Sequence, residues 1–284
     1  MTVRSSVEDV RAPLAERGFV VLPSGAFDAS LLSEPFSFVE ALVGERPLMV
    51  ERQTIRSVPG GRSFASTNVV TPMHTDSQPY LGNAPALQVM WCRRPAPSGG
   101  ECQLVDGARL LATVEREDSE LYRALFDVPR RIPFYFGDFV GPTARRHATG
   151  APILTVSPMP LDASDSIGAR FAAFVAKAPR IEFLLAAGEL LLVDNFRMLH
   201  GRRAFSGDDR ELVRLLSWQR TPLSLQRPLA PAAPGTVDRK LAAILDLALG
   251  LSPAKVAARE GVREQELYAW RDEALTAARA ALTR

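Results

Sequence analysis

The chain has 284 residues, of which 46% are hydrophobic and 23% are charged, so it is long enough for a large domain with its own core. Its 34 Lys and Arg nearly balance its 32 Asp and Glu, and the net charge of +2 excludes a strong general attraction to nucleic acid or acidic lipid. Two cysteines exclude a disulfide framework, and the lack of an 18-residue apolar run and of a secretory signal predicts a soluble, cytoplasmic protein without membrane spans.

The hydrophobic periodicity predicts many short strands and few helices. In chain order, we expect a helix at 5–17, strands at 19–22, 67–71, 86–92 and 102–106, helices at 110–126 and 167–177, and strands at 180–185, 189–193 and 212–218. Ser5 and Glu8 are spaced as a capping box for the first helix, and Gly18 follows its end. Because Gly and Pro turns separate the strands, we predict a mainly β fold with flanking helices, built from two sheets.

The last part of the chain differs from the rest in composition. A linker rich in Pro and Ala at 227–235 separates a domain predicted at 1–226 from a helical extension predicted at 236–284. Within this extension, small and apolar residues surround a glycine with the spacing of a helix-turn-helix, and they resemble the helix-turn-helix of transposase-type proteins: Val256, Ala257, Gly261, Val262, Leu267 and Trp270.

Two of the three histidines have neighbours that suit a metal site. His74 and Asp76 are two residues apart, so on an extended chain their side chains point the same way. His200 follows the apolar strand predicted at 189–193, whereas His147 lies in a polar stretch that we expect to be an exposed loop. Two imidazoles and one carboxylate form the facial triad of non-haem iron(II) oxygenases, which leaves coordination positions open. The alternative is that these histidines are hydrogen-bonded core residues and that Asp76 caps a loop.

Two blocks of the sequence resemble the taurine dioxygenase superfamily, and within it the γ-butyrobetaine and trimethyllysine hydroxylase branch. The residues that carry the resemblance are 74–80, 85–88, Cys92, 99–107, 194–205 and Arg210, and the resemblance covers roughly 15–220. It implies a double-stranded β-helix, or jelly roll, that uses Fe(II), 2-oxoglutarate and O2, with His74, Asp76 and His200 as the iron ligands.

The resemblance also implies how 2-oxoglutarate is held. Arg210, ten residues after His200, occupies the place of the arginine that binds the far carboxylate, and the planar guanidinium suits that role. Cys102 stands where many relatives have a threonine that helps to hold 2-oxoglutarate. A thiol is a weaker hydrogen-bond donor than a hydroxyl, so the sequence departs from the pattern at this position.

Further residues are candidates for substrate contact. Arg214 aligns with an arginine that faces the substrate in some relatives, and on a strand it would share a face with Arg210. The weaker candidates, each of which could instead be structural, are Asn68, Gln78, Tyr80 and Gln88. No aromatic cage for a trimethylammonium group is evident, although Tyr80, Trp91 and Trp218 are candidate members, so carnitine synthesis is not the expected role.

These residues predict an oxygenase that hydroxylates an unactivated C–H bond of a small molecule and releases succinate and CO2. We expect the substrate to carry a carboxylate and to resemble an amino acid, free or tethered to a carrier, and we expect that the protein could form a homo-oligomer. The alternative is a DNA-binding regulator that uses the iron domain as a sensor. Acidic residues outnumber basic ones in the second helix predicted in the extension, from Arg263 to Glu273, so nucleic acid is not the expected partner.

Overall fold

The computed structural model of the chain divides into two compact units, residues 1–229 and 230–284. It describes residues 7–28, 32–76, 84–134, 137–147, 151–219, 240–241, 243–244, 246–247 and 252–282. Among these residues no helix is long and apolar enough to cross a membrane.

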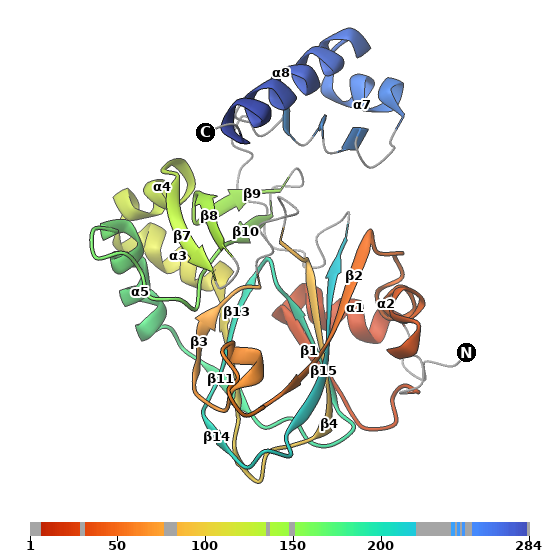
Figure 1. The fold of residues 1–284 in the computed structure, drawn as a ribbon, viewed down its shortest axis with the longest axis vertical. Helices are drawn as coiled ribbons and strands as arrows, with labels where there is room; N and C mark the ends of the chain where they lie inside the picture. Colours follow the sequence, from red (N-terminus) through yellow and green to blue (C-terminus); the bar gives the residue numbers. More distant parts are fainter. Residues whose placement is uncertain are drawn as a thin grey trace. The chain divides into compact units, whose positions relative to one another are not determined.

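Two antiparallel sheets form the centre of the first unit (Figure 1). The five-stranded sheet has the order β1 (Phe19–Leu22), β12 (Leu190–Asp194), β4 (Leu87–Arg94), β15 (Glu211–Trp218) and β2 (Met49–Arg56). The four-stranded sheet has the order β11 (Ile181–Phe183), β6 (Cys102–Asp106), β13 (Met198–Arg202) and β3 (Thr71–His74). Three two-stranded sheets pair β5 (Ser98–Gly99) with β14 (Phe205–Ser206), β7 (Arg130–Phe134) with β8 (Gly137–Gly141), and β9 (Ala144–Arg146) with β10 (Pro152–Leu154).

Strict alternation along β12 gives the five-stranded sheet two different faces. Leu190 and Leu192 pack in one core cluster with residues of α1 (Val7–Arg17) and α2 (Pro35–Val43). Leu191 and Val193 point the other way and pack with Leu104 of the four-stranded sheet. Successive side chains of a strand lie on opposite faces, so an uninterrupted apolar run buries both of them. The second cluster therefore fills the space between the two sheets, where the pocket described below lies.

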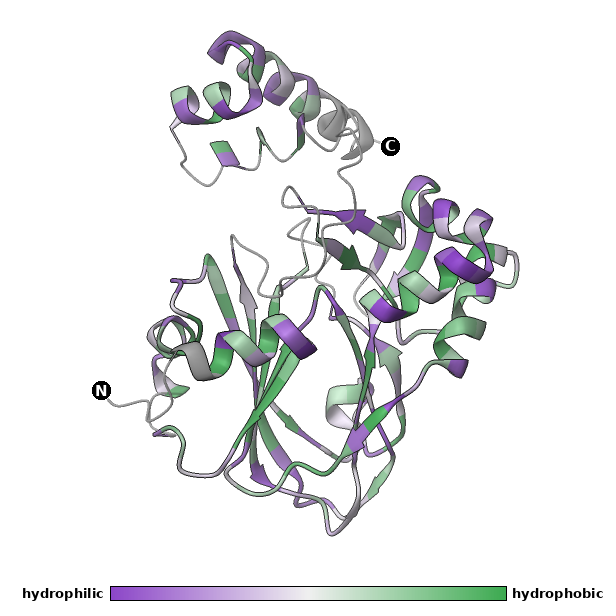
Figure 2. Ribbon diagram, turned by 180° about the vertical axis from the view of Figure 1, so that it is seen from behind, coloured by the Kyte–Doolittle hydropathy of each residue, from purple (hydrophilic) through white to green (hydrophobic). Residues whose placement is uncertain are grey.

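Helices cover the outer face of the four-stranded sheet. Val105 and Leu199 of this sheet pack with apolar residues of α3 (Gly107–Glu117), α4 (Ser119–Asp127) and α5 (Ser166–Lys177). Figure 2 shows that these helices carry hydrophilic as well as hydrophobic residues, as expected for helices with one solvent face. The first unit is thus a mixed helix and sheet structure rather than a purely β one.

The observed elements differ from the predicted ones at several points. The helix predicted at 110–126 is two helices that meet at Asp118, whose carboxylate accepts from the Leu121 N–H at 3.0 Å and so begins α4. The strands predicted at 180–185 and 189–193 belong to different sheets, β11 and β12. The hydrophobic pattern gave no prediction for α2, β2 or the short 3-10 helix Phe64–Ser66.

In the second unit the described residues form α7 (Pro253–Glu260) and α8 (Glu264–Leu282). Gly261 lies between them with a positive φ of 65°, a conformation that favours glycine. Val256, Ala257 and Leu267 are buried in the small core of this unit.

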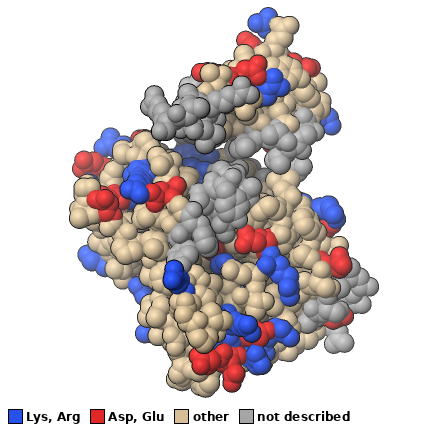
Figure 3. Space-filling view, in the orientation of Figure 1, with Lys and Arg blue, Asp and Glu red and all other residues tan. Residues whose placement is uncertain are grey.

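On the face shown in Figure 3, Lys and Arg side chains lie among Asp and Glu side chains. Ion pairs of the first unit reflect this mixture, for example Arg170 with Asp118 at 2.7 Å and Arg203 with Glu182 at 2.7 Å.

Candidate metal centre and its pocket

The predicted metal ligands lie together at one end of the four-stranded sheet. His74, the last residue of β3, is the register partner of His200 in β13, and their ring centroids are 4.3 Å apart. The Asp76 carboxylate lies 3.6 Å from His200 Nε2 and 4.0 Å from His74 Nε2. One ligand atom from each residue can be chosen so that all three lie within 4.8 Å of one another. Two segments from distant parts of the sequence therefore bring three ligand groups to one point.

Hydrogen bonding and burial prepare His74 to bind a metal ion as a neutral imidazole. Its Nδ1 lies 2.9 Å from the Pro72 carbonyl oxygen and donates to it, which leaves Nε2 as the nitrogen with a free lone pair. Burial, and secondarily the neighbouring His200, lowers the pKa of His74 from 6.5 to about 3. The ring is therefore neutral at ordinary pH.

The Asp76 carboxylate is held as an anion. Burial alone would raise the pKa of this carboxyl. The Arg214 guanidinium and His200 together lower it by more than burial raises it, so the pKa lies well below its usual range. Arg214 Nη1 donates to Asp76 Oδ1 at 3.1 Å, and its Nη2 donates to Gln53 Oε1 at 2.6 Å. The sequence analysis missed Gln53, which lies opposite Arg214 in the register of β2 and β15.

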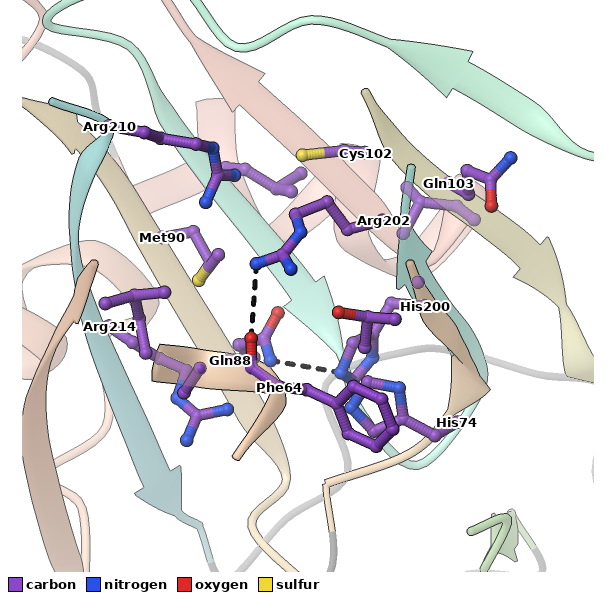
Figure 4. A pocket seen from close by; sticks show the side chains of 16 residues that line it. Phe64, His74, Gln88, Met90, Cys102, Gln103, His200, Arg202, Arg210 and Arg214 are labelled. Atoms are coloured by element: carbon purple, nitrogen blue, oxygen red, sulfur yellow. Dashed lines mark hydrogen bonds between the residues drawn. The ribbon is translucent and has the colours of Figure 1, made fainter. Parts of the chain in front are cut away.

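Gln88 connects two of the predicted ligands. Its Nε2 donates to Asp76 Oδ2. The same nitrogen lies 3.1 Å from His200 Nε2, a contact that Figure 4 draws. Gln88 is buried and lines the pocket, so it lies where the sequence predicted a substrate contact, but its amide nitrogen contacts the ligand side chains.

A pocket of about 610 Å³, counting the solvent at its mouth, lies between the two sheets beside these residues. Ile55, Met90, Leu104 and Leu191 supply apolar surface to it. In Figure 4 the guanidinium groups of Arg202, Arg210 and Arg214 point into the same space as the two imidazoles. Arg210, which immediately precedes β15, and Arg214 within β15 both line the pocket.

Arg210 is a buried cation in this pocket. It is 4% exposed, and among the described residues no acidic side chain pairs with it. Its guanidinium carbon lies 5.0 Å from the centre of the Phe205 ring, and burial lowers its pKa. An arginine in this setting is suited to binding the carboxylate of a ligand. Cys102 lines the same pocket, and burial raises the pKa of its thiol, so it stays protonated.

Arg202 is a pocket residue to which the sequence analysis gave no role. Its guanidinium donates to the carbonyl oxygens of Phe64 at 3.3 Å, Thr67 at 2.9 Å and Val69 at 2.7 Å (Figure 4 draws the first). Burial, together with the neighbouring Arg210, lowers the pKa of Arg202 to about 10. Its place two residues after His200 in the same strand could have pointed to this site.

The remaining candidates are not among the described residues that line this pocket. Asn68 is exposed, and it is not among the residues that line this pocket. Gln78 and Tyr80 lie outside the described residues. His147 was expected in an exposed loop, but it is half-buried beyond the end of β9, with its ring centre 6.4 Å from that of Phe196. The buried Phe196 ring is therefore one of its neighbours.

The donor set suits ferrous iron. Two imidazoles and a carboxylate are the ligands that non-haem iron(II) oxygenases use, and three protein ligands leave positions for other molecules. Within the described part of the chain His200 Nδ1 is buried without a hydrogen-bond partner, whereas His74 is oriented through its Nδ1.

Comparison with known proteins identifies relatives of part of this chain. Gamma-butyrobetaine dioxygenase of Homo sapiens is 24% identical over 163 residues, which are 50% of this chain and 42% of that protein. Dioxygenase str8 of Strobilurus tenacellus is 28% identical over 170 residues, which are 53% of this chain and 39% of that protein. The chain thus spans about two fifths of the length of these curated relatives.

Solved structures resemble the fold. Asparagine oxygenase in complex with Fe(II), 2S,3S-3-hydroxyasparagine and succinate matches with a TM-score of 0.57 and 19% identity, covering 78% of this chain and 79% of that one. The non-heme iron oxygenase OrfP in complex with Fe, succinate and (3R,4R)-dihydroxy-L-Arg matches with a TM-score of 0.55 and 14% identity, covering 76% and 80%. Residues 2–216 match the family described as "Taurine catabolism dioxygenase TauD, TfdA family", and the chain therefore belongs to this family of dioxygenases.

Proposed function

We propose that this protein is an Fe(II)- and 2-oxoglutarate-dependent oxygenase that hydroxylates an unactivated C–H bond of a small, carboxylate-bearing molecule, with release of succinate and CO2. The observation that carries the proposal is the meeting of His74, Asp76 and His200 within 4.8 Å of one another. Family membership agrees with it. We further propose that residues 1–226 form the oxygenase domain and that its two facing sheets are a double-stranded β-helix.

In this proposal His74, Asp76 and His200 hold the iron, and the iron supplies the activation of O2 that the side chains alone lack. Arg210 binds the far carboxylate of 2-oxoglutarate, because it is a buried guanidinium whose fork no acidic group of the described residues occupies. Cys102 lies beside it as a neutral thiol and contributes a weak hydrogen bond at most. The apolar residues between the sheets keep water away from the reacting groups.

The pocket favours an anionic substrate. Three arginines line it, and among the described residues Asp76 is the one carboxylate that forms an ion pair with any of them, through Arg214. If Arg210 binds 2-oxoglutarate, Arg214 in β15 is the candidate cation for a substrate carboxylate. An amino-acid-like molecule, free or tethered to a carrier, fits this charge, and the solved relatives include an asparagine oxygenase bound to a hydroxyasparagine. Gln88, Asn68, Gln78 and Tyr80 stay candidates for further contacts.

The test is succinate formation from 2-oxoglutarate by the full-length protein with Fe(II), across a library of amino acids and other carboxylates. We expect a substrate that raises succinate release and gains the mass of one oxygen atom. A product that loses two hydrogens instead would replace hydroxylation by desaturation or ring closure. No succinate release with any carboxylate, from folded and iron-loaded protein, would contradict the proposed activity.

The substrate charge is tested separately with Arg214→Gln. We expect a raised KM for the carboxylate substrate, because a charge-assisted hydrogen bond to an arginine is lost. Full activity of this variant, on a substrate without any anionic group, would contradict the assignment of Arg214 to the substrate.

A further inference from the structure

Asn195 lies in a buried turn between β12 and β13, and the turn does not depend on its side chain. The Asp194 carboxylate makes the turn by accepting from the N–H groups of Phe196 at 2.9 Å and Arg197 at 3.3 Å. The Asn195 N–H donates to the Ala86 carbonyl at 2.9 Å. The carbonyls of Phe196 and Arg197 also have partners. Phe196 accepts from the Leu154 N–H at 3.1 Å, and Arg197 accepts from the Gly107 N–H at 2.9 Å. The turn backbone is therefore fixed from several sides.

The Asn195 side chain bonds to segments far away in the sequence. Its Oδ1 accepts from the Asp76 N–H at 2.8 Å, and its Nδ2 donates to the Asp76 carbonyl at 2.8 Å. The same Nδ2 donates to the Pro85 carbonyl at 2.8 Å. Asn195 is 0% exposed, so water does not compete for these groups. One carboxamide thus satisfies both backbone groups of a predicted metal ligand.

The bonds from Asn195 are important for Asp76 because Asp76 lies beyond the end of the sheet. β3 ends at His74, so no strand ladder fixes the backbone of Asp76. The preceding residue, Thr75, is bonded through its N–H to the Val156 carbonyl at 3.0 Å. At Asp76 itself the backbone partners are on Asn195, which is rigidly held in its own turn. The position of the Asp76 backbone therefore follows from the position of the Asn195 amide, while Arg214 and Gln88 contact the carboxylate that this backbone carries.

We propose that Asn195 is a positioning residue that holds Asp76 in place for metal binding, an inference that rests on the proposed metal site. Asparagine suits this role because the carboxamide offers one acceptor and two donors, and here all three hydrogen bonds are formed. An aspartate at this position would keep the acceptor and lose both donors. Groups that orient metal ligands typically contribute about 10–100-fold to metal affinity.

The experiment is a titration of the full-length, metal-stripped protein with Co(II), which takes the same nitrogen and oxygen ligands as Fe(II). Affinity comes from calorimetry, and the visible spectrum of bound Co(II) reports its ligand geometry. The variants are Asn195→Ala and the nearly isosteric Asn195→Asp. Thr143→Val is the matched control, since Thr143 is also 0% exposed but its hydroxyl accepts from Arg130 Nε at 2.8 Å. Thermal unfolding of each variant gives its stability.

We expect Asn195→Ala to weaken Co(II) binding by about 10–100-fold and to alter the Co(II) spectrum, while Thr143→Val binds as wild type. If Asn195→Ala does not fold, Asn195→Asp is expected to show the loss of affinity and the altered spectrum. Wild-type affinity in a folded Asn195 variant, or a loss in Thr143→Val equal to that in the Asn195 variant, overturns the role of Asn195. Failure of the wild type to bind Co(II) at all would instead overturn the proposed metal site.

Discussion

At the scale of single residues, the centre combines a neutral imidazole at His74, one anion and several buried cations. Each charge state has a local cause: His74 is neutral because it is buried beside His200, and Asp76 is ionised because Arg214 and His200 outweigh its burial. Arg210 keeps its guanidinium inside the protein without an acidic partner among the described residues. These causes lead to one prediction for His74 and one for Arg210.

The first concerns the pH dependence of the metal-free protein. The pKa of His74 is lowered from 6.5 to about 3 in the folded state, so between these values only the unfolded chain takes up a proton at this position. The contribution of His74 to stability is therefore complete above pH 6.5 and is lost as the pH falls toward 3. Urea unfolding across this range should show a smaller loss of stability in His74→Gln than in wild type. Equal losses in the two proteins would contradict the prediction.

The second concerns Arg210. Arg210→Lys keeps the charge but loses the planar fork, so we expect the KM for 2-oxoglutarate to rise about 10–100-fold, as for loss of a hydrogen bond between charged groups. The matched control is Arg203→Lys, because Arg203 is exposed and its Nε donates to Glu182 at 2.7 Å. Steady-state kinetics with varied 2-oxoglutarate measure both. An unchanged KM in Arg210→Lys would assign the co-substrate carboxylate to another cation.

At the scale of elements, the ends of strands and helices place the site. Arg197 lies in the turn before β13, and it joins three elements. Its guanidinium donates to the Asp106 carboxylate at 2.6 and 3.0 Å and to the carbonyls of Ala15 and Glu16 near the end of α1, at 3.2 Å each. Asp106 also caps α3 by accepting from the Ala108 N–H at 3.0 Å. This ion pair ties β6, α1 and α3 to the turn that precedes His200.

Asp106→Ala should therefore cost about 3 kcal/mol of unfolding free energy, because it leaves the largely buried Arg197 unpaired. Asp106→Asn keeps an acceptor for the helix cap and should cost less. Asp208→Ala, at an exposed loop position, should change stability by about 0.5 kcal/mol at most. Urea denaturation at neutral pH measures all three. A cost for Asp106→Ala as small as that of the loop control would show that the ion pair contributes little.

The sequence was sufficient to predict some of these elements but not others. Apolar runs such as 189–193 and 212–218 were long enough to identify β12 and β15. It could not predict that 180–185 and 189–193 enter different sheets, because the pairing partner of a strand depends on the whole fold. The split of the helix predicted at 110–126 depends on a cap made by Asp118, a residue that is also compatible with a continuous solvent-exposed helix face.

The residues of the site also differ in whether the sequence could predict them. His74, Asp76, His200 and Arg210 follow from motif spacing and from the resemblance of two blocks of sequence, and the structure brings all four to one region. The roles of neighbouring amides were not predictable. Gln53 and Asn195 act through contacts with residues more than a hundred positions away, and short-range spacing carries no information on such pairs.

At the scale of the whole molecule, two facing sheets enclose the pocket, and one face of each sheet is covered by helices. Burial of both faces of β12 makes the support of the pocket rigid. His74 at the end of β3 and His200 in β13 line the pocket. The α7–α8 unit has a small core of its own. The central claim is thus that distant segments of the first unit form one iron site.

Anaerobic titration of the metal-stripped protein with Fe(II) tests this claim most directly, with the bound iron counted per chain. We expect one Fe(II) per chain in the wild type and a loss of tight binding in each of the folded variants His74→Ala, Asp76→Ala and His200→Ala, with binding retained in His147→Ala. Tight binding of iron that survives in all three ligand variants, or a folded wild type that takes up no iron, would contradict the claim.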